Sequence, residues 1–431
     1  MKRYPTYKDS GVKWIGEIPS HWKTRKIKYI FTEKSEKGYP DEPVLCSTQK
    51  YGVIPQSMYE NRVVVVNKGL EGLKLVRKGE FVISLRSFQG GIEYAHYQGI
   101  ISAAYTILKL NEGIDAEYMK YLLKSFEFIQ LLQTCVTGIR EGQNINYALL
   151  RKNYIALPPF PEQRAIVSFL DSELGKIDTY VEKEKQLIER LKELKQSVIA
   201  RAVTRGINPD AKMKPSGISW IVDIPQHWKL RKIKNIFKER SVKGYPDEPV
   251  LCSTQKYGVI PQSMYENRVV VVNKGLKDLK LVRKGDFVIS LRSFQGGIEY
   301  AHYRGIISAA YTILELDPTI NVEFMKYLLK SFDFIQLLQT CVTGIREGQN
   351  INYGMLRQNH IALPTIDEQI AIANYITAAT TKIDRLIVEK TYEIEHIKEL
   401  RQRLIADAVT GKIDVREPLN KKGAAAATDR E

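Results

Sequence analysis

The chain carries almost the same sequence twice, and the two copies align without a gap at a separation of 206 residues. The stretch YPDEPVLCSTQKYGVIPQSMYENRV occupies residues 39–63 and returns unchanged at residues 245–269. A period of this length is far beyond the ~20–50 residues of a solenoid repeat. The repeat therefore predicts a duplicated domain, and a chain of 431 residues is long enough for each copy to bury its own core.

The two copies are nearly identical in one part and divergent in another. Residues 37–110 and 243–316 differ at five pairs of positions: Glu71/Lys277, Gly72/Asp278, Glu80/Asp286, Gln98/Arg304 and Lys109/Glu315. Residues 160–203 have diverged from their equivalents while keeping a similar pattern. We therefore predict a domain at 1–158, a helical segment at 159–206, a second domain at 207–364, a second helical segment at 365–412, and a disordered tail at 413–431.

The nearly identical part has the composition of a mixed fold. The runs RVVVVN, FVISLRS and ISAAYTILKL (62–67, 81–87 and 101–110) are rich in β-branched and aromatic residues and are separated by Gly and Pro. Residues 116–135 place apolar side chains at helical spacing. The predicted fold class is α+β, with two globular domains joined by two long helices.

The divergent part predicts long helices with an apolar stripe. The stripe steps alternately by three and four residues, which is typical of helix pairs. We expect the stripes of the two copies to pack against each other in an antiparallel coiled coil; the alternative is that each stripe packs on its own domain. The predicted packing residues are Ile177, Leu187, Leu191, Leu194, Val198, Ile383, Leu386, Ile394, Ile397, Leu400 and Leu404.

Composition indicates a basic, cytoplasmic protein. Lys and Arg number 65 against 49 Asp and Glu, so the net charge is +16, which attracts polyanions such as nucleic acid. The four cysteines form two repeat-related pairs, Cys46/Cys252 and Cys135/Cys341, without a C-x-x-C motif. We expect free, buried thiols of a reducing compartment. No signal peptide is recognisable, and the apolar runs are strand-sized.

Motifs of catalysis are missing from the sequence. It contains no G-x-x-x-x-G-K-[ST], H-E-x-x-H or G-x-S-x-G pattern, and no two of its six histidines fall at ligand spacing. We therefore predict no catalytic residue, no metal site and no cofactor.

Three loops in each copy combine cations, amides, hydroxyls and aromatic rings. Arg, Gln and Asn are the side chains that read base edges in the DNA grooves, and Lys neutralises phosphates. The alternative is that the loops are ordinary turns, and Phe88 fits a core position better than an intercalating wedge. The predicted DNA-binding residues are Ser47, Thr48, Gln49, Lys50, Tyr51, Arg86, Ser87, Phe88, Gln89, Arg140, Gln143 and Asn144, with their equivalents Ser253, Thr254, Gln255, Lys256, Tyr257, Arg292, Ser293, Phe294, Gln295, Arg346, Gln349 and Asn350.

Four longer stretches resemble the specificity subunits of type I restriction-modification systems. They are YKDSGVKWIGEIPSHW, SFQGGI, TGIREGQNINYALLRKNYIALPPFPEQRAIVSFLD and KIDTYVEKEKQLIERLKELKQSVIARAVT. The resemblance implies a non-enzymatic subunit whose two target recognition domains each read one half of a bipartite site on double-stranded DNA. It also implies two antiparallel spacer helices, two methyltransferase (modification) subunits as partners, and, in complexes that cleave DNA, restriction subunits.

The chain departs from the family pattern because its two domains are near-copies rather than unlike. Two matched domains predict two halves of the same sequence, hence an interrupted palindrome. The alternatives are a stand-alone DNA-binding or architectural protein without a methyltransferase partner, a coiled-coil scaffold, and an isolated enzyme whose active site the motif search does not find.

Overall fold

The computed structural model describes residues 2–60, 69–138, 144–265, 275–291, 293–344 and 350–416. The chain divides into two compact units: unit 1 is Met1–Glu184 with Tyr392–Glu431, and unit 2 is Lys185–Thr391. Two long helices, α5 (Phe160–Arg205) and α10 (Ile366–Val409), each contribute to both units. Each unit therefore combines one copy of the domain with helical segments from both copies.

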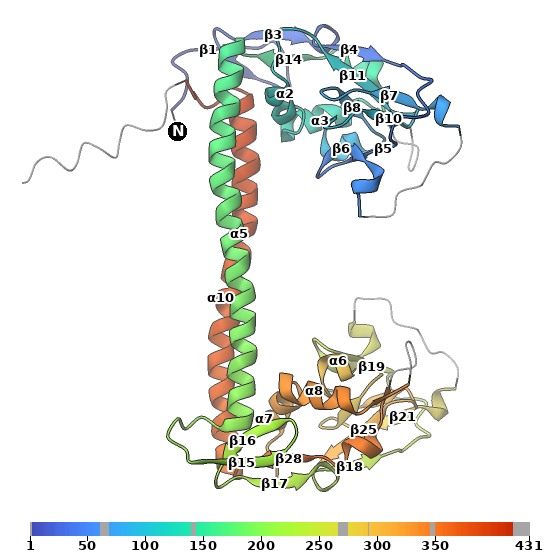
Figure 1. Cartoon of the computed structure of the whole chain (residues 1–431), viewed down its shortest axis with the longest axis vertical. Helices are drawn as coiled ribbons and strands as arrows, with labels where there is room; N and C mark the ends of the chain where they lie inside the picture. The colour runs from blue at the N-terminus through green and yellow to red at the C-terminus, as the bar shows by residue number, and fades with distance from the viewer. Residues whose placement is uncertain are drawn as a thin grey trace, which may run out of the picture. The chain divides into compact units, whose positions relative to one another are not determined.

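Among the described residues, the domain of unit 1 contains short antiparallel strands and the α-helices α1 to α4 (Figure 1). Its largest sheet has the order β4-β11-β8-β9, and the remaining strands pair as β1-β2, β3-β14, β5-β6, β7-β10 and β12-β13. The elements are β1 (Tyr7–Asp9), β2 (Glu17–Pro19), β3 (Lys23–Lys26), β4 (Phe31–Lys34), β5 (Leu45–Thr48), β6 (Gly52–Pro55), β7 (Lys74–Val76), β8 (Phe81–Ile83), α1 (Ser87–Gly90), β9 (Glu93–Tyr94), β10 (Gly99–Ile101), β11 (Thr106–Leu110), α2 (Ala116–Leu122), α3 (Phe126–Thr134), β12 (Val136–Thr137), β13 (Asn144–Ile145), α4 (Tyr147–Leu150) and β14 (Tyr154–Leu157).

The domain of unit 2 repeats this topology, with the sheet order β18-β25-β22-β23 and the pairs β15-β16, β17-β28, β19-β20, β21-β24 and β26-β27. Its elements are β15 (Met213–Ile218), β16 (Ile221–Pro225), β17 (Lys229–Lys232), β18 (Phe237–Arg240), β19 (Leu251–Thr254), β20 (Gly258–Pro261), β21 (Lys280–Val282), β22 (Phe287–Ile289), α6 (Ser293–Gly296), β23 (Glu299–Tyr300), β24 (Gly305–Ile307), β25 (Thr312–Leu316), α7 (Val322–Leu329), α8 (Phe332–Thr340), β26 (Val342–Thr343), β27 (Asn350–Ile351), α9 (Tyr353–Leu356) and β28 (His360–Leu363).

The mixed α+β composition agrees with the prediction, but two predicted elements are each divided. The helix expected at 116–135 is two helices, because the Ser125 side chain accepts a hydrogen bond from Phe128 N and begins α3 as its N-cap. The run 101–110 forms the end of β10 and the whole of β11, with a turn between them. The predicted strand at 62–67 lies outside the described residues.

Each unit has a large core that joins its domain to both long helices. In unit 1, buried Tyr118, Met119 and Leu122 of α2 belong to one apolar cluster with Leu404 and Ala408 of α10. Figure 1 shows α2 and α3 between the strands of unit 1 and the long helices. In unit 2, the equivalent cluster includes Ile199, Ala202 and Val203 of α5. The first domain is therefore anchored by the end of α10, which belongs to the second copy of the repeat. The second domain is anchored by the end of α5, which belongs to the first copy.

The apolar stripe of the long helices follows a different phase from the predicted one. Leu187, Leu194, Leu386 and Leu400 are exposed, so their assignment to the stripe is wrong. The less exposed positions, apart from Glu393, are 177, 181, 184, 188, 191, 195 and 198 on α5 and 383, 387, 390, 394, 397, 401 and 404 on α10. From residue 177, the observed stripe steps first by four residues, whereas the predicted stripe steps first by three. Because neighbouring positions of a helix point about 100° apart, this change of phase buries Ile188 in place of Leu187.

Polar contacts join the two helices inside each unit. In unit 1, Arg401 Nε lies 3.3 Å from Asp178 Oδ1, and the Tyr180 hydroxyl donates to Glu393, so the segments run in opposite directions there. In unit 2, Lys195 Nζ lies 2.6 Å from Asp384 Oδ2. The ion pairs of the two units use equivalent positions of the repeat. In the described part of the chain, no helix has the length and apolar character required to cross a membrane.

Candidate nucleic-acid interface

In unit 1, described residues of the three loops singled out in the sequence lie within or next to α1. The Gln49 side chain lies so close to Gly90 that a Cβ added to this glycine would be 2.7 Å from Gln49 Cδ. Helix α1 also contacts β13, which begins at Asn144. In unit 2, Gln255 covers Gly296 and α6 contacts β27 in the same way. The described residues of the loops therefore lie close together, although residues 49 and 144 are far apart in the sequence.

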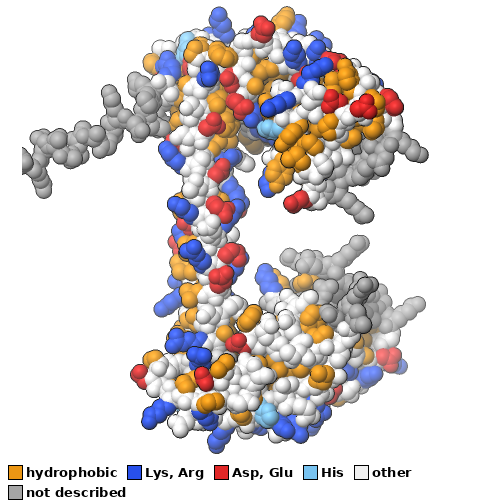
Figure 2. Space-filling view, viewed as in Figure 1, with side chains coloured by type: hydrophobic (Ala, Val, Ile, Leu, Met, Phe, Trp, Pro, Cys, Tyr) orange, Lys and Arg blue, Asp and Glu red, His pale blue; other side chains and the backbone are white. Residues whose placement is uncertain are grey.

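We call the exposed part of this surface the loop face. In unit 1 it consists of Gln49, Lys50, Tyr51, Arg86 and Gln89, which are exposed, and the half-buried Asn144. In unit 2 the described members are Gln255, Lys256, Tyr257, Gln295 and Asn350. Figure 2 shows basic and apolar side chains intermixed on the domain surface of unit 1, rather than segregated into patches.

Lys50 and Tyr51 form a paired group at the tip of the β5–β6 hairpin. Lys50 Nζ lies 4.7 Å from the centre of the Tyr51 ring, and the equivalent distance from Lys256 to Tyr257 is also 4.7 Å. A hydrogen bond to Tyr51 raises the pKa of Lys50 above its ordinary value. The hairpin is held by the bridge Val53–Ala95 and a small apolar core. The tip thus presents a cation and an aromatic face from a fixed base.

Some predicted contact residues have their side chains committed to the fold. Thr48 is buried; its hydroxyl donates to Gly52 O and accepts from Tyr51 N, each at 3.0 Å. Ser87 is buried, and its Oγ accepts from Ser84 N at 2.9 Å. Phe88 is half-buried and packs against the main core, and Ser47 Oγ is buried without a hydrogen-bond partner.

The same residues of unit 2 are committed in the same way. They are Ser253, Thr254, Ser293 and Phe294. The predicted DNA contacts of Thr48, Ser87, Thr254 and Ser293 are corrected, because their buried hydroxyls bond within the loops. The contacts of Ser47, Phe88, Ser253 and Phe294 stay predictions. Five further predicted contacts, Arg140, Gln143, Arg292, Arg346 and Gln349, lie outside the described residues.

A cleft beside the loop face was not identified from the sequence. It has a volume of about 990 Å³ in unit 1 and about 980 Å³ in unit 2, and Gln49, Lys50 and Tyr51 form one side of it in unit 1. Glu117, Lys120 and Tyr121 of α2 and Lys124, just after its end, form another side. The sequence did contain a signal for this cleft. These four residues are identical in the second copy, at Glu323, Lys326, Tyr327 and Lys330, whereas the neighbouring positions 115, 116 and 118 differ from their equivalents.

The cations of the cleft in unit 1 have partners within the protein. Lys124 Nζ lies 2.6 Å from Glu93 Oε2 and donates to Gln49 O at 3.0 Å. Burial raises the pKa of Glu93, which is 2% exposed, and Lys124 opposes this shift. Lys120 Nζ lies 2.7 Å from Glu117 Oε2 and 4.7 Å from the centre of the Tyr94 ring. These pairs position the hairpin against α2 and leave the loop face as the better candidate for contact with phosphates and bases.

Among the described residues, no group of three or more His, Cys, Asp or Glu side chains is placed to hold a metal ion. The four cysteines are buried and free, and burial raises the pKa of each thiol.

Comparison with known proteins identifies similar sequences over most of the chain. Residues 19–193 and 225–396 match the family model for the type I restriction modification DNA specificity domain. The putative type I restriction enzyme MjaX specificity subunit of Methanocaldococcus jannaschii is 24% identical, over 95% of this chain and 98% of the relative. The MjaVIII specificity subunit of the same organism is 25% identical, over 93% of this chain and 92% of the relative.

Two solved structures share the fold at low sequence identity. The HsdS subunit from Thermoanaerobacter tengcongensis aligns with a TM-score of 0.52 and 15% identity, over 92% of this chain and 98% of that chain. A chain from a structure of complex assembly and conformational transition in the type I R-M system aligns with a TM-score of 0.63 and 16% identity, over 92% and 99% of the two chains.

Proposed function

Because this chain belongs to the family of type I restriction-modification DNA specificity subunits, we propose that it recognises a bipartite DNA target whose two halves have the same sequence. Specificity subunits of these systems recognise DNA sequence and are non-catalytic. The observation that carries the proposal is the identity of the loop faces: every described member of the unit 2 face has the same residue as its unit 1 equivalent.

The loop face supplies the chemistry of base reading. Gln49, Arg86 and Gln89 are exposed, and such side chains form bidentate hydrogen bonds with adenine or guanine in the major groove. Lys50 adds a charge that neutralises phosphate and makes the affinity depend on salt. We propose that these contacts, with Asn144 and their unit 2 equivalents, select the sequence of each half-site.

The two halves are proposed to form an inverted repeat with an unspecified gap. A short sequence read by two identical modules occurs on both strands when the modules bind in opposite orientations. The family resemblance implies this arrangement, with residues 1–158 and 207–364 as target recognition domains. Residues 159–206 and 365–412 are proposed to form a coiled-coil spacer that sets the gap.

The proposed partners are double-stranded DNA, methyltransferase (modification) subunits and, where cleavage occurs, restriction subunits. Adenine methylation and cleavage belong to those subunits. A stand-alone DNA-binding role is less favoured, because the family match extends through both domains and both helical segments. Co-purification with a methyltransferase subunit from a cell that expresses both distinguishes the two roles.

The test of the target is a genome-wide map of methylated adenines by single-molecule sequencing. Cells that express this chain with its methyltransferase subunit are expected to show one interrupted palindrome as the modified motif. Cells with the methyltransferase alone are the control. An asymmetric bipartite motif would contradict the proposal. A second modified motif that the control cells lack would also contradict it, because matched loop faces predict one motif.

A further inference from the structure

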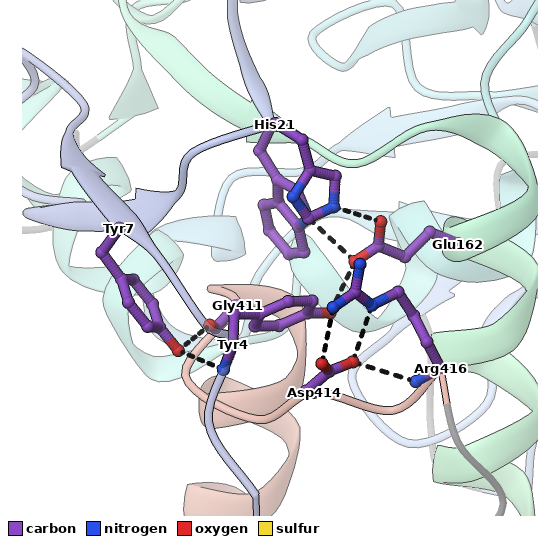
Figure 3. A network of polar contacts seen from close by, with 8 residues as sticks. Tyr4, Tyr7, His21, Glu162, Gly411, Asp414 and Arg416 are labelled. Atoms are coloured by element: carbon purple, nitrogen blue, oxygen red, sulfur yellow. Dashed lines mark hydrogen bonds and ion pairs between the residues drawn. The ribbon is translucent and has the colours of Figure 1, made fainter.

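Two segments that are far apart in the sequence meet in unit 1, as Figure 3 shows: residues 2–9 and residues 410–416. The backbone N–H of Asp414 donates to Lys2 O at 2.9 Å. The Tyr7 hydroxyl donates to Gly411 O at 3.0 Å and accepts a bond from Tyr4 N at 3.1 Å. The strand-forming start of the domain is therefore bonded to the segment that follows α10.

Arg416 extends these contacts to the beginning of α5. It binds Asp414 through Nε at 2.9 Å and through a terminal nitrogen at 2.7 Å, and this pairing lowers the pKa of Asp414. Its guanidinium lies 4.8 Å from the centre of the Tyr4 ring. The Tyr4 hydroxyl in turn donates to Glu162 Oε1 at 2.5 Å, and Trp22 Nε1 donates to the same oxygen at 2.9 Å.

The segment after α10 also enters the core. Ile413 is 7% exposed and belongs to the main apolar cluster of unit 1. The hydroxyl of Tyr118, which is fully buried in α2, donates to Val409 O at 3.0 Å. This bond satisfies a carbonyl of the last helical turn, which has no partner within the helix.

Unit 2 makes the corresponding junction with the peptide chain itself. Helix α5 ends at Arg205, and residues 206–212 lead directly into β15. Phe324 stands at the position of Tyr118, Asp210 at that of Tyr4 and Met213 at that of Tyr7, so none of the three phenolic hydroxyls is present. Ile207, the equivalent of Ile413, is 38% exposed.

We propose that residues 410–416 are a releasable clasp, which fastens the first domain to α10 by non-covalent contacts. In unit 2, by contrast, the peptide chain itself joins the second domain to α5. Release of the clasp loosens unit 1 and leaves unit 2 intact. The consequence for DNA rests on the proposed function: with the clasp open, recognition of one half-site weakens while recognition of the other persists.

The chemistry of the clasp is suited to reversible opening. The Arg416 and Lys412 side chains are 44% and 51% exposed, so solvent screens their ion pairs and these contribute little. The buried side chain of Ile413 and the hydrogen bond from the half-buried Tyr7 to Gly411 O supply most of the hold. A partner surface that binds residues 410–416 would compete with the domain for the same groups.

Two chains of different length test the clasp directly. A chain that ends at Val409 lacks it, and a chain that ends at Arg416 keeps it and serves as the matched control. Hydrogen exchange measured by mass spectrometry is compared between peptides from β1–β2 and those from the equivalent β15–β16. In the shorter chain we expect exchange to become roughly tenfold faster or more in β1–β2, with β15–β16 unchanged, because several buried contacts are lost from one unit alone.

A second variant keeps the test valid if the shorter chain does not fold. The double substitution Tyr7→Phe with Ile413→Ala removes one hydrogen bond and part of one buried apolar side chain that hold the clasp. We expect exchange in β1–β2 to rise by roughly several-fold, because one hydrogen bond and several buried carbon atoms are lost. Unchanged β1–β2 exchange in both variants, or equal acceleration in both units, would overturn the clasp.

A binding experiment separates this proposal from the proposed function. Fluorescence anisotropy with the purified complex compares a duplex that contains both half-sites with one in which a half-site is scrambled. The chain that ends at Val409 is expected to lose the advantage of the complete site, whereas the chain that ends at Arg416 keeps it. If the full-length chain shows no preference for either duplex, the proposed function fails, and the exchange result still decides whether the clasp exists.

Discussion

The two units present the same loop face but differ in the ion pairs near the start of β8 and its equivalent β22. In unit 1, Arg77 binds Glu36 through two hydrogen bonds of 2.9 and 2.7 Å, and its backbone N–H donates to Glu80. Both Arg77 and Glu36 are partly exposed. The carboxyl of Glu80 is buried, and this burial raises its pKa.

In unit 2 the same region has been rebuilt around a buried pair. Val242 replaces the Glu36 carboxylate, and Arg240, at the position of Lys34, lies 2.6 Å from Asp286 Oδ2. The charged groups of this region have thus changed together, with the loss of one partner offset by another. The exposed residues of the loop face have not changed. Under the proposed function, a half-site shared by the two units accounts for this constancy.

The largest expected effect comes from the residues that the units share. Arg86→Ala combined with Arg292→Ala removes one base-reading candidate from each domain. We expect a loss of about 2–6 kcal/mol in binding free energy for the complete target, because each bidentate Arg contact is worth about 1–3 kcal/mol. Gel-shift titration at fixed salt measures the loss.

The matched control removes two cations that lie away from the loop face. Lys23→Ala with Lys229→Ala changes exposed, equivalent residues of β3 and β17 and lowers the net charge by the same amount. It is expected to weaken binding to all duplexes slightly and equally. If the arginine and lysine variants lose the same affinity, the loop face has no part in reading bases.

A second prediction concerns the pair that the units do not share. Arg240→Met leaves the Asp286 carboxylate buried without its cation, and we expect a loss of about 3 kcal/mol of stability in unit 2. Lys34→Met, the equivalent change in unit 1, should cost less than about 1 kcal/mol, because the Lys34 side chain is 34% exposed. Urea unfolding with local hydrogen exchange measures both, and equal effects would show that the two supports are interchangeable.

A third prediction uses pH to distinguish the units. Asp317 accepts hydrogen bonds from Thr319 N and its hydroxyl, and Arg231 lies 2.6 Å from it; these contacts lower the pKa of Asp317 to about 2. Unit 1 has the neutral Asn111 at this position. Since the folded pKa lies below the unfolded one, the stabilisation is present above pH 3.8 and is lost as the pH falls toward 2.

The substitution Asp317→Asn tests this dependence. At neutral pH it should destabilise unit 2 by about 1 kcal/mol, since solvent screens a group near the surface. The difference from the wild-type chain should shrink as the pH is lowered toward about 2, while peptides of unit 1 show no difference at any pH. A constant difference across this range, measured by hydrogen exchange or urea unfolding, would assign the effect to packing rather than to ionisation.

The repeat and the periodicity predicted much of the architecture because both can be recognised within the sequence itself, without knowledge of long-range contacts. A 206-residue repeat predicts two similar domains, and long apolar periodicity predicts long helices, which α5 and α10 provide. The phase of the stripe was harder to predict. Leu187 and Ile188 are adjacent and equally apolar, and only the partner surface decides which of them is buried.

The candidate site was predictable in chemistry but not in arrangement. Residue types predict Gln49, Arg86 and Gln89 as candidates for base reading, yet contact between the first loop and α1 depends on long-range packing. Buried Thr48 and Ser87 have the same polar groups as contact residues, and the sequence alone does not reveal that local bonds use them. The junction of residues 2–9 with 410–416 has no sequence pattern of its own, and it contradicts the predicted disorder for residues 413–416.

The smallest expected effect concerns position 98 and its equivalent, where a neutral residue faces a cation. Gln98 Nε2 donates to Glu42 Oε1 at 2.7 Å, and Arg304 Nε lies 2.7 Å from Glu248 Oε1, so both side chains are directed to the same acidic residue of the repeat. The Arg304 side chain is 50% exposed, and such a pair contributes at most about 1 kcal/mol.

Because Glu248 already neutralises it, Arg304 should add no phosphate contact. We therefore expect Arg304→Gln, which makes the two units alike at this position, to leave both the affinity for DNA and its dependence on salt unchanged. If Arg304 did contact a phosphate, the substitution would reduce the slope of log K against log salt by about 1. Anisotropy titrations over a series of salt concentrations measure that slope, and the reciprocal variant Gln98→Arg should likewise leave it unchanged.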